Sequence, residues 1–113
     1  MKVVALTPDL LDRSKVSAAF PDAVHVGAAA LLGRVGEGAD LVLVDLERPG
    51  AVEAVTDLRA TRVVAFGPHV DGDLLAAATA LGVEAMPRSR FFRLLADGAF
   101  TAPKQSGNSA SSS

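Results

Sequence analysis

Short apolar runs alternate with stretches of helical periodicity through residues 1–100. The apolar runs predict five strands, at residues 2–6, 23–26, 41–46, 61–66 and 83–86. Apolar residues elsewhere recur every three or four positions, which predicts helices at residues 8–20, 28–35, 51–60, 72–81 and 90–97. Because strands and helices alternate, we expect right-handed crossovers and a parallel sheet covered on both faces. The prediction is a doubly wound, five-stranded α/β fold with strand order 2-1-3-4-5.

Residues suited to turns and helix caps mark the ends of the predicted elements. Thr7 can cap the first helix, with Pro8 in the first helical position. Asp71 and Ser89 are suited to cap the fourth and fifth helices, and Gly82 can end the fourth in a left-handed conformation. The predicted elements therefore have local stop and start signals as well as the right periodicity.

Composition places the chain among single-domain proteins. Of its 113 residues, 50% are hydrophobic, which is enough for one packed core. We expect that domain to cover residues 1–100, and the serine-rich residues 101–113 to form a disordered tail. The absence of cysteine suits a reducing compartment, and no targeting or membrane-spanning run is visible, so we expect a cytoplasmic protein. A formal charge of -2 gives no general attraction to nucleic acid or anionic membrane.

The sequence DLVLVDLERP at residues 40–49 contains the first candidate for function. It predicts a buried strand that ends at Asp45, and ligands of open parallel sheets gather at the carboxyl ends of the strands. The expected strand order places Thr7, Asp45 and Gly67 around one shallow cleft at that edge. A second interpretation stays open, in which Asp45 is a strand-exit residue that hydrogen-bonds the following turn.

Over residues 1–100 the chain resembles the receiver domains of two-component response regulators. LVLVDLERPG is similar to the strand and turn that carry a receiver's phosphoacceptor aspartate. RVVAFGPHVDGDLLAAATALG is similar to the fourth strand and helix, and VEAMPRSRFF to the fifth strand and following loop. The resemblance implies a site that takes up a phosphoryl group on aspartate. In that family an acidic pair after the first strand holds magnesium, aided by a Thr or Ser after the fourth strand and a Lys after the fifth.

Position by position, the resemblance covers only part of that site. Asp45 matches the phosphoacceptor, but Thr7 and Pro8 stand where the acidic pair belongs, with only Asp9 nearby. A hard cation that requires several oxygen ligands would have lost most of its charge complement. We therefore expect no metal site, and magnesium as a cofactor only if Asp45 is phosphorylated.

The two remaining supports of the site are also altered. Gly67 occupies the hydroxyl position and can donate only its backbone N–H. Arg88 occupies the basic position, where it keeps the charge but replaces a compact ammonium group with a broad guanidinium. Since phosphoryl transfer depends on positioning and electrostatic stabilisation, these changes argue against efficient phosphorylation of Asp45.

Other polar residues give weaker signals. His69 and Asp71 lie on the loop after the fourth strand, where a surface histidine and a capping aspartate explain them without function. His25 lies in the second strand. With two histidines, no cysteine and no linking motif, a zinc site is not expected, and no glycine-rich phosphate loop follows the first strand.

Arg90, Phe91, Phe92 and Arg93 form a candidate interaction surface at the start of the last helix. One ring must face the core, which leaves the other partly exposed among arginines, a composition favoured at protein interfaces. The resemblance implies that the face of helix four, strand five and helix five meets a protein partner or a second copy of the chain. The alternative is that arginine stems merely cover phenylalanine rings at a solvated edge.

These observations predict a stand-alone, degenerate receiver that acts as a signalling or protein–protein interaction module and is not an enzyme. Two alternatives stay open. The first is a functional single-domain response regulator phosphorylated on Asp45. The second is a flavodoxin-like protein that binds a small anion or cofactor, for which we expect a concave pocket near Thr7, Gly67 and Arg88.

Overall fold

The structure, a computed structural model, describes residues 1–68 and 72–100. Parallel strands form one sheet in the order β2-β1-β3-β4-β5, which confirms the predicted fold and strand order. The strands are β1 (Val3–Leu6), β2 (Val24–His25), β3 (Leu41–Asp45), β4 (Val63–Gly67) and β5 (Glu84–Pro87). Since β1 and β3 lie inside the sheet while β2 and β5 form its edges, the most apolar strands are the most enclosed ones.

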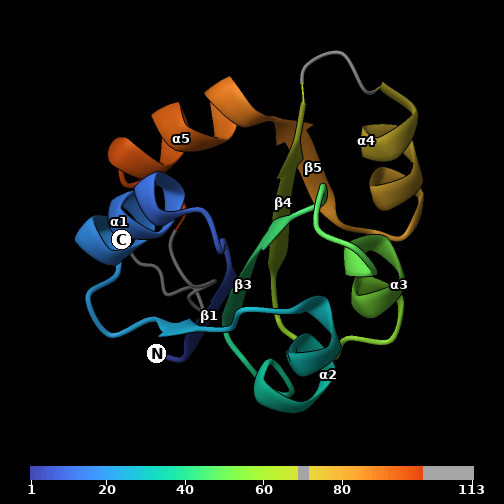
Figure 1. Cartoon of the computed structure of the whole chain (residues 1–113), viewed down its shortest axis with the longest axis horizontal. Coiled ribbons are helices and arrows are strands. Elements are labelled where there is room, and N and C mark those ends of the chain that lie inside the picture. The colour runs from blue at the N-terminus through green and yellow to red at the C-terminus, as the bar shows by residue number, and fades with distance from the viewer. Residues whose placement is uncertain (69–71, 101–113) are drawn as a thin grey trace, which may run out of the picture.

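Helices cover both faces of this sheet (Figure 1). The first and last helices lie together on one face, and the helices between them lie on the other. They are α1 (Leu10–Ala19), α2 (Leu32–Val35) after a short 3-10 turn η1 (Ala29–Leu31), α3 (Ala51–Thr56), α4 (Gly72–Ala80) and α5 (Arg88–Ala96). No helix in the two described ranges is long and apolar enough to cross a lipid bilayer.

Strand β3 divides the core into two halves. Val42 and Val44 pack with residues of α3 and α4, whereas Leu41 and Leu43 pack with residues of α1 and α5. This alternation follows from the two-residue period of a strand, and both sets are buried because helices cover both faces. An uninterrupted apolar run therefore ends in one carboxylate, Asp45, at the edge of the sheet.

Helices α1, α3 and α5 each differ from the prediction by two or more residues at one end. Helix α1 begins at Leu10, not at Pro8, because Asp9 rather than Thr7 caps it: Asp9 Oδ1 accepts the N–H groups of Leu11 at 3.0 Å and Asp12 at 3.1 Å. Helix α5 begins at Arg88, so Ser89 is not its cap. Helix α3 ends at Thr56 instead of extending to residue 60. The proposed cap of the fourth helix, Asp71, lies outside the described residues.

The segment at residues 28–35 is a 3-10 turn followed by a single α-helical turn, not one continuous helix. Its first positions follow Ala28 and Leu31, neither of which offers a capping side chain, and Gly33 lies inside it. Both features weaken a helix.

Gly67 is the last residue of β4 rather than part of the turn after it. Gly82 has a φ of 84°, as expected for the left-handed stop after α4.

Candidate functional site at the carboxyl edge of the sheet

Three of the predicted cleft residues lie at the same edge of the sheet. The register pairs Leu6 with Val44, so Thr7 follows β1 beside the point where β3 ends in Asp45. Asp45 is in turn paired with Phe66, and Gly67 ends β4 one residue later. The topology thus places Thr7, Asp45 and Gly67 where a doubly wound sheet binds its ligands.

Asp45 is only 1% exposed, and its carboxylate bonds to the turn that follows β3. Oδ1 accepts the backbone N–H of Glu47 at 3.0 Å, and Oδ2 accepts Nε of Arg48 at 3.1 Å. These are the contacts of a strand-exit aspartate that stabilises the next turn. Both carboxylate oxygens therefore have a donor within the adjacent three residues.

Arg88, the predicted basic residue, is bonded to an acid that the sequence interpretation missed. Its guanidinium donates to Oδ1 of Asp12, which lies on α1 and is 1% exposed. Asp12 precedes the buried Val16 by four residues, so the two share the inward face of the helix. That spacing is the signal that could have identified Asp12 as a buried carboxylate.

The electrostatic environment of Arg88 is strongly acidic. The hydrogen bond to Asp12 is the main cause of its raised pKa, and the charges of Asp12, Asp45 and Asp9 raise the pKa further, while burial opposes them. The guanidinium carbon also lies 5.0 Å from the ring centroid of Phe92. Arg88 is therefore held between the carboxyl edge of the sheet and the aromatic side of α5.

Two buried oxygen atoms at this edge have no hydrogen-bond partner among the described residues. They are Oγ1 of Thr7 and Oδ2 of Asp12. Asp9 is exposed, and its Oδ1 is engaged in capping α1. Residues 1–68 and 72–100 contain no group of three or more His, Cys, Asp or Glu side chains arranged to hold a metal ion.

His25 lies apart from these residues of the carboxyl edge, and His69 is outside the described residues. His25 in β2 lies with Nε2 3.1 Å from Oγ of Ser17, and its Nδ1 is buried without a partner among the described residues. Burial, and then the charge of Arg13, lower the pKa of His25. His69 and Asp71 are outside the described residues, so their expected place beside the cleft stays a prediction.

The aromatic pair at the start of α5 points in two directions. Phe91 is fully buried against Phe66, with ring centroids 4.4 Å apart, so it cannot contact a partner. Phe92 is half-buried and faces α1, where Nζ of Lys15 lies 4.9 Å from its ring centroid. Only Arg90 and Arg93 of the predicted interaction surface are exposed. The rings turn inward because successive residues lie about 100° apart around a helix and α5 packs on both the sheet and α1.

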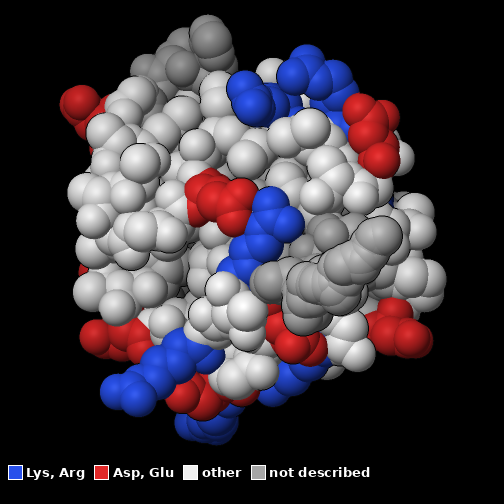
Figure 2. All heavy atoms as spheres, turned by 180° about the vertical axis from the view of Figure 1, so that it is seen from behind, with Lys and Arg blue, Asp and Glu red and all other residues white. Residues whose placement is uncertain are grey.

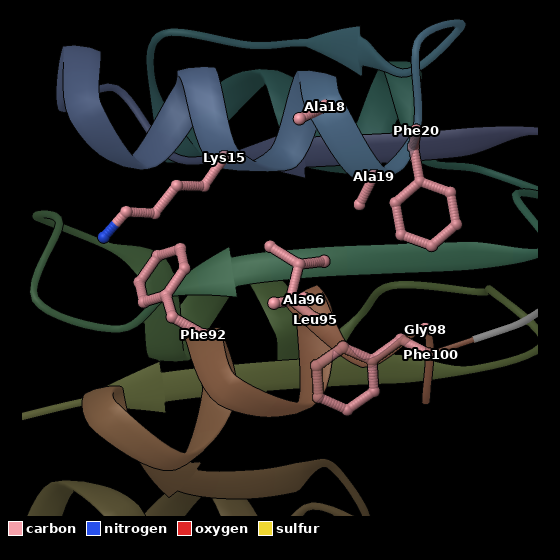
Figure 3. Close-up of a pocket in the computed structure, with 9 residues that line it drawn as sticks. All are labelled: Lys15, Ala18, Ala19, Phe20, Phe92, Leu95, Ala96, Gly98 and Phe100. Atoms are coloured by element: carbon pink, nitrogen blue, oxygen red, sulfur yellow. The ribbon is translucent and has the colours of Figure 1, made fainter.

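Two further features were not foreseen from the sequence. Leu10 and Leu11, at the start of α1, are 80% and 74% exposed. A cavity of about 650 Å³ lies between α1 and α5, and it is lined by neither Thr7, Gly67 nor Arg88 (Figure 3). This cavity therefore does not match the pocket expected of a small-anion site at the carboxyl edge.

Comparisons with known proteins identify the fold. No family model matches the chain, and no curated protein matches it. Among solved structures, a response regulator from Hahella chejuensis has a TM-score of 0.70 at 16% identity, covering 92% of this chain and 98% of that one. A response regulator receiver domain from Rhodospirillum rubrum has a TM-score of 0.63 at 18% identity, covering 95% and 100%. The phosphorylated cyanobacterial phytochrome response regulator RcpA has a TM-score of 0.67 at 18% identity, covering 83% and 87%. The chain has the fold of response-regulator receiver domains.

Proposed function

We propose that this chain is a degenerate receiver, a signalling or protein–protein interaction module that works without phosphorylation of Asp45. The observation that carries the proposal is the state of the two charged groups at the carboxyl edge. Both oxygens of Asp45 accept hydrogen bonds from the next turn, and Arg88 is bonded to Asp12. A phosphoryl group on Asp45 would have to displace the donors that now bond to its oxygens. Arg88 would have to leave Asp12 before it could neutralise the added charge.

A magnesium ion fits the residues at this edge poorly. Thr7 contributes one neutral oxygen and Pro8 contributes no side-chain ligand. Asp12 is paired with Arg88 through Oδ1, so only its Oδ2 has no partner among the described residues. Mg²⁺ requires near-octahedral oxygen coordination and is usually bound through carboxylates. Without the ion, the charge that develops in phosphoryl transfer would be met only by Arg48, which is already bonded to Asp45, and by Arg88, which is bonded to Asp12.

The position that carries a hydroxyl in receivers is tightly packed as well as altered. A Cβ atom on Gly67 would lie 3.3 Å from Cδ2 of Leu75 and 3.4 Å from Cδ2 of Leu74. A Ser or Thr side chain would therefore meet the ends of two leucine side chains of α4, which would have to shift slightly to admit it. This supports a surface function for the domain rather than a switch operated from the cleft.

We propose further that the face formed by α4, β5 and α5 meets a protein partner or a second copy of the chain. Strand β5 is an edge strand, so one side of its backbone is unpaired within the sheet. Arg90 and Arg93 are exposed on the adjoining helix. On the face seen in Figure 2, basic and acidic side chains are interspersed and form no continuous basic surface, which favours a protein partner over nucleic acid.

The test of the proposal is incubation of the full chain with acetyl phosphate and Mg²⁺, followed by intact-mass measurement. We expect no phosphoryl adduct, and a result identical to that of Asp45→Asn. The double variant Thr7→Asp with Pro8→Asp restores the acidic pair and serves as the matched control for metal binding. In amide NMR spectra we expect Mg²⁺ to shift resonances around Asp45 saturably in this variant and not in the natural chain.

The alternative is a working phosphoacceptor. It is favoured by the position of Asp45 at the end of β3 and by the phosphorylated state of the similar RcpA structure. A mass increase by one phosphoryl group that disappears in Asp45→Asn would establish that alternative and overturn the proposal. Among the described residues at this edge no nucleophile is paired with a base, so these residues do not favour a catalytic role.

A further inference from the structure

The cavity between α1 and α5 exists because small residues face each other across the helix pair. Ala18 and Ala19 of α1 lie opposite Ala96 and Gly98 at the end of α5 (Figure 3). All four residues are exposed to solvent, so this space is an open groove along the helix pair that side chains this small do not fill. The resulting volume of about 650 Å³ lies within the range of small-molecule binding sites.

The walls of the cavity are mainly aromatic and aliphatic. Phe20 and Phe100 lie at one end, Phe92 lies at the other, and Leu95 lies between them (Figure 3). Three of the five phenylalanines in the chain thus line one space. Aromatic and apolar walls of this kind bind the apolar body of a ligand and bury little of a sugar or a nucleotide favourably.

Lys15 is the cation among the lining residues, and it lies at the end of the cavity that Phe92 forms. The ammonium group of Lys15 is 4.9 Å from the centroid of the Phe92 ring. It forms no ion pair with any residue in the described ranges, and no acidic residue is among those that line the cavity. An unpaired ammonium beside an apolar space is complementary to an anionic head group attached to an apolar body.

We propose that this cavity binds an amphipathic carboxylate, such as a medium-chain fatty acid. The apolar body lies against Leu95 and the phenylalanine rings, and the carboxylate accepts from Nζ of Lys15. The proposal does not depend on the function proposed for Asp45, because the cavity lies between two helices and contains none of the residues at the carboxyl edge of the sheet.

The probe is decanoate, added below its micelle concentration to the full chain and followed by amide NMR and calorimetry. We expect saturable shifts confined to α1, α5 and residues 98–100. Lys15→Met should weaken binding about tenfold, because a charge-assisted hydrogen bond is lost while the apolar stem is kept. The matched control is Arg13→Met, which removes an exposed cation from the same helix without touching the cavity. Decan-1-ol, which lacks the charge, should bind the natural chain about as weakly as decanoate binds Lys15→Met.

A second variant tests the volume rather than the charge. Ala19→Trp introduces a bulky side chain at an exposed helix position and should abolish decanoate binding while the melting temperature is retained. If that variant does not fold, Ala18→Phe replaces it.

Three results would overturn the proposal. One is the absence of saturable shifts in the natural chain, and another is equal weakening by Lys15→Met and Arg13→Met. The third is a dimer, seen by sedimentation, that Ala19→Trp dissociates and decanoate does not affect, since the cavity would then be an interface between copies.

Discussion

Asp12 and Arg88 form an ion pair whose two members differ in exposure. The Asp12 side chain is 1% exposed and the Arg88 side chain 41% exposed. If Asp12 is removed, the arginine can be hydrated by the solvent it already meets. If Arg88 is removed, the Asp12 carboxylate remains buried with no cation bonded to it. Leaving a buried charge unpaired lowers the free energy of unfolding more than removing the buried partner does.

We therefore predict unequal effects of neutralising the two partners. Arg88→Met should lower the free energy of unfolding by about 3 kcal/mol, and Asp12→Asn by only about 1 kcal/mol. The double variant should be less destabilised than Arg88→Met alone, because the buried charge is gone. Urea unfolding of the three variants at neutral pH measures this, and equal losses in both single variants would show that the pair acts as an ordinary surface contact.

The position of Asp45 could be predicted from the sequence because the information is local. Apolar residues lead directly to an acid and then to a turn, so its place at the carboxyl edge follows from the pattern. Its hydrogen bonds to Glu47 and Arg48 are local too. Asp12 could not be assigned in the same way, because its partner is 76 residues away and a single acid in a helix is usually solvated.

At the scale of elements, the strands were more predictable than the helix ends. Strand β3 is specified by a run that is apolar at every position before its terminal acid. The start of α1 depends instead on which of two capping residues, Thr7 or Asp9, takes the extended conformation. In α5 the sequence indicated adjacent aromatic residues but not the helix face toward which each would point. That direction depends on the packing of α5 against α1, which has no local signature.

Helix α5 also carries the prediction that concerns association. With Phe91 buried and Phe92 facing α1, the exposed Arg90 and Arg93 remain as polar contacts for the proposed face. Reversing both charges, Arg90→Glu with Arg93→Glu, should weaken self-association or partner capture about tenfold, or about 1.4 kcal/mol. Sedimentation measures the self-association and pull-down measures the partner capture. Arg59→Glu, at another exposed arginine, is the matched control. Association that is unaffected by the double variant would place the interface elsewhere, with the exposed Leu10 and Leu11 as the next surface to alter.

At the scale of the whole molecule, strand order was predictable because alternating strands and helices permit few topologies once crossovers are right-handed. The cavity was not, because it arises where small residues of two helices far apart in sequence come to face each other. Periodicity identifies which residues of a helix face inward. It gives no information on whether the two inward faces fill the space between them.

We propose that the folded unit ends at about residue 100. Phe100 is buried and its ring centroid lies 5.2 Å from that of Phe91. Deleting residues 101–113 should leave the melting temperature unchanged, whereas Phe100→Ala in the full chain should cost about 3 kcal/mol of stability. Thermal and urea unfolding of the shortened chain and of Phe100→Ala measure both effects on stability. A large loss of stability on deletion would show that the serine-rich segment contributes to the fold.

The pairing of the first and last helices on one face has a consequence for the chain during synthesis. Residues 1–87 contain the complete sheet but not α5, whose Phe91 and Leu95 pack in the same cluster as Leu41, Leu43 and Phe66. While a ribosome has not yet released the last helix, that apolar face is open to water and to other nascent chains. Completion of the domain therefore depends on residues that are made after the whole sheet, and a chain halted before α5 is exposed to aggregation rather than merely shortened.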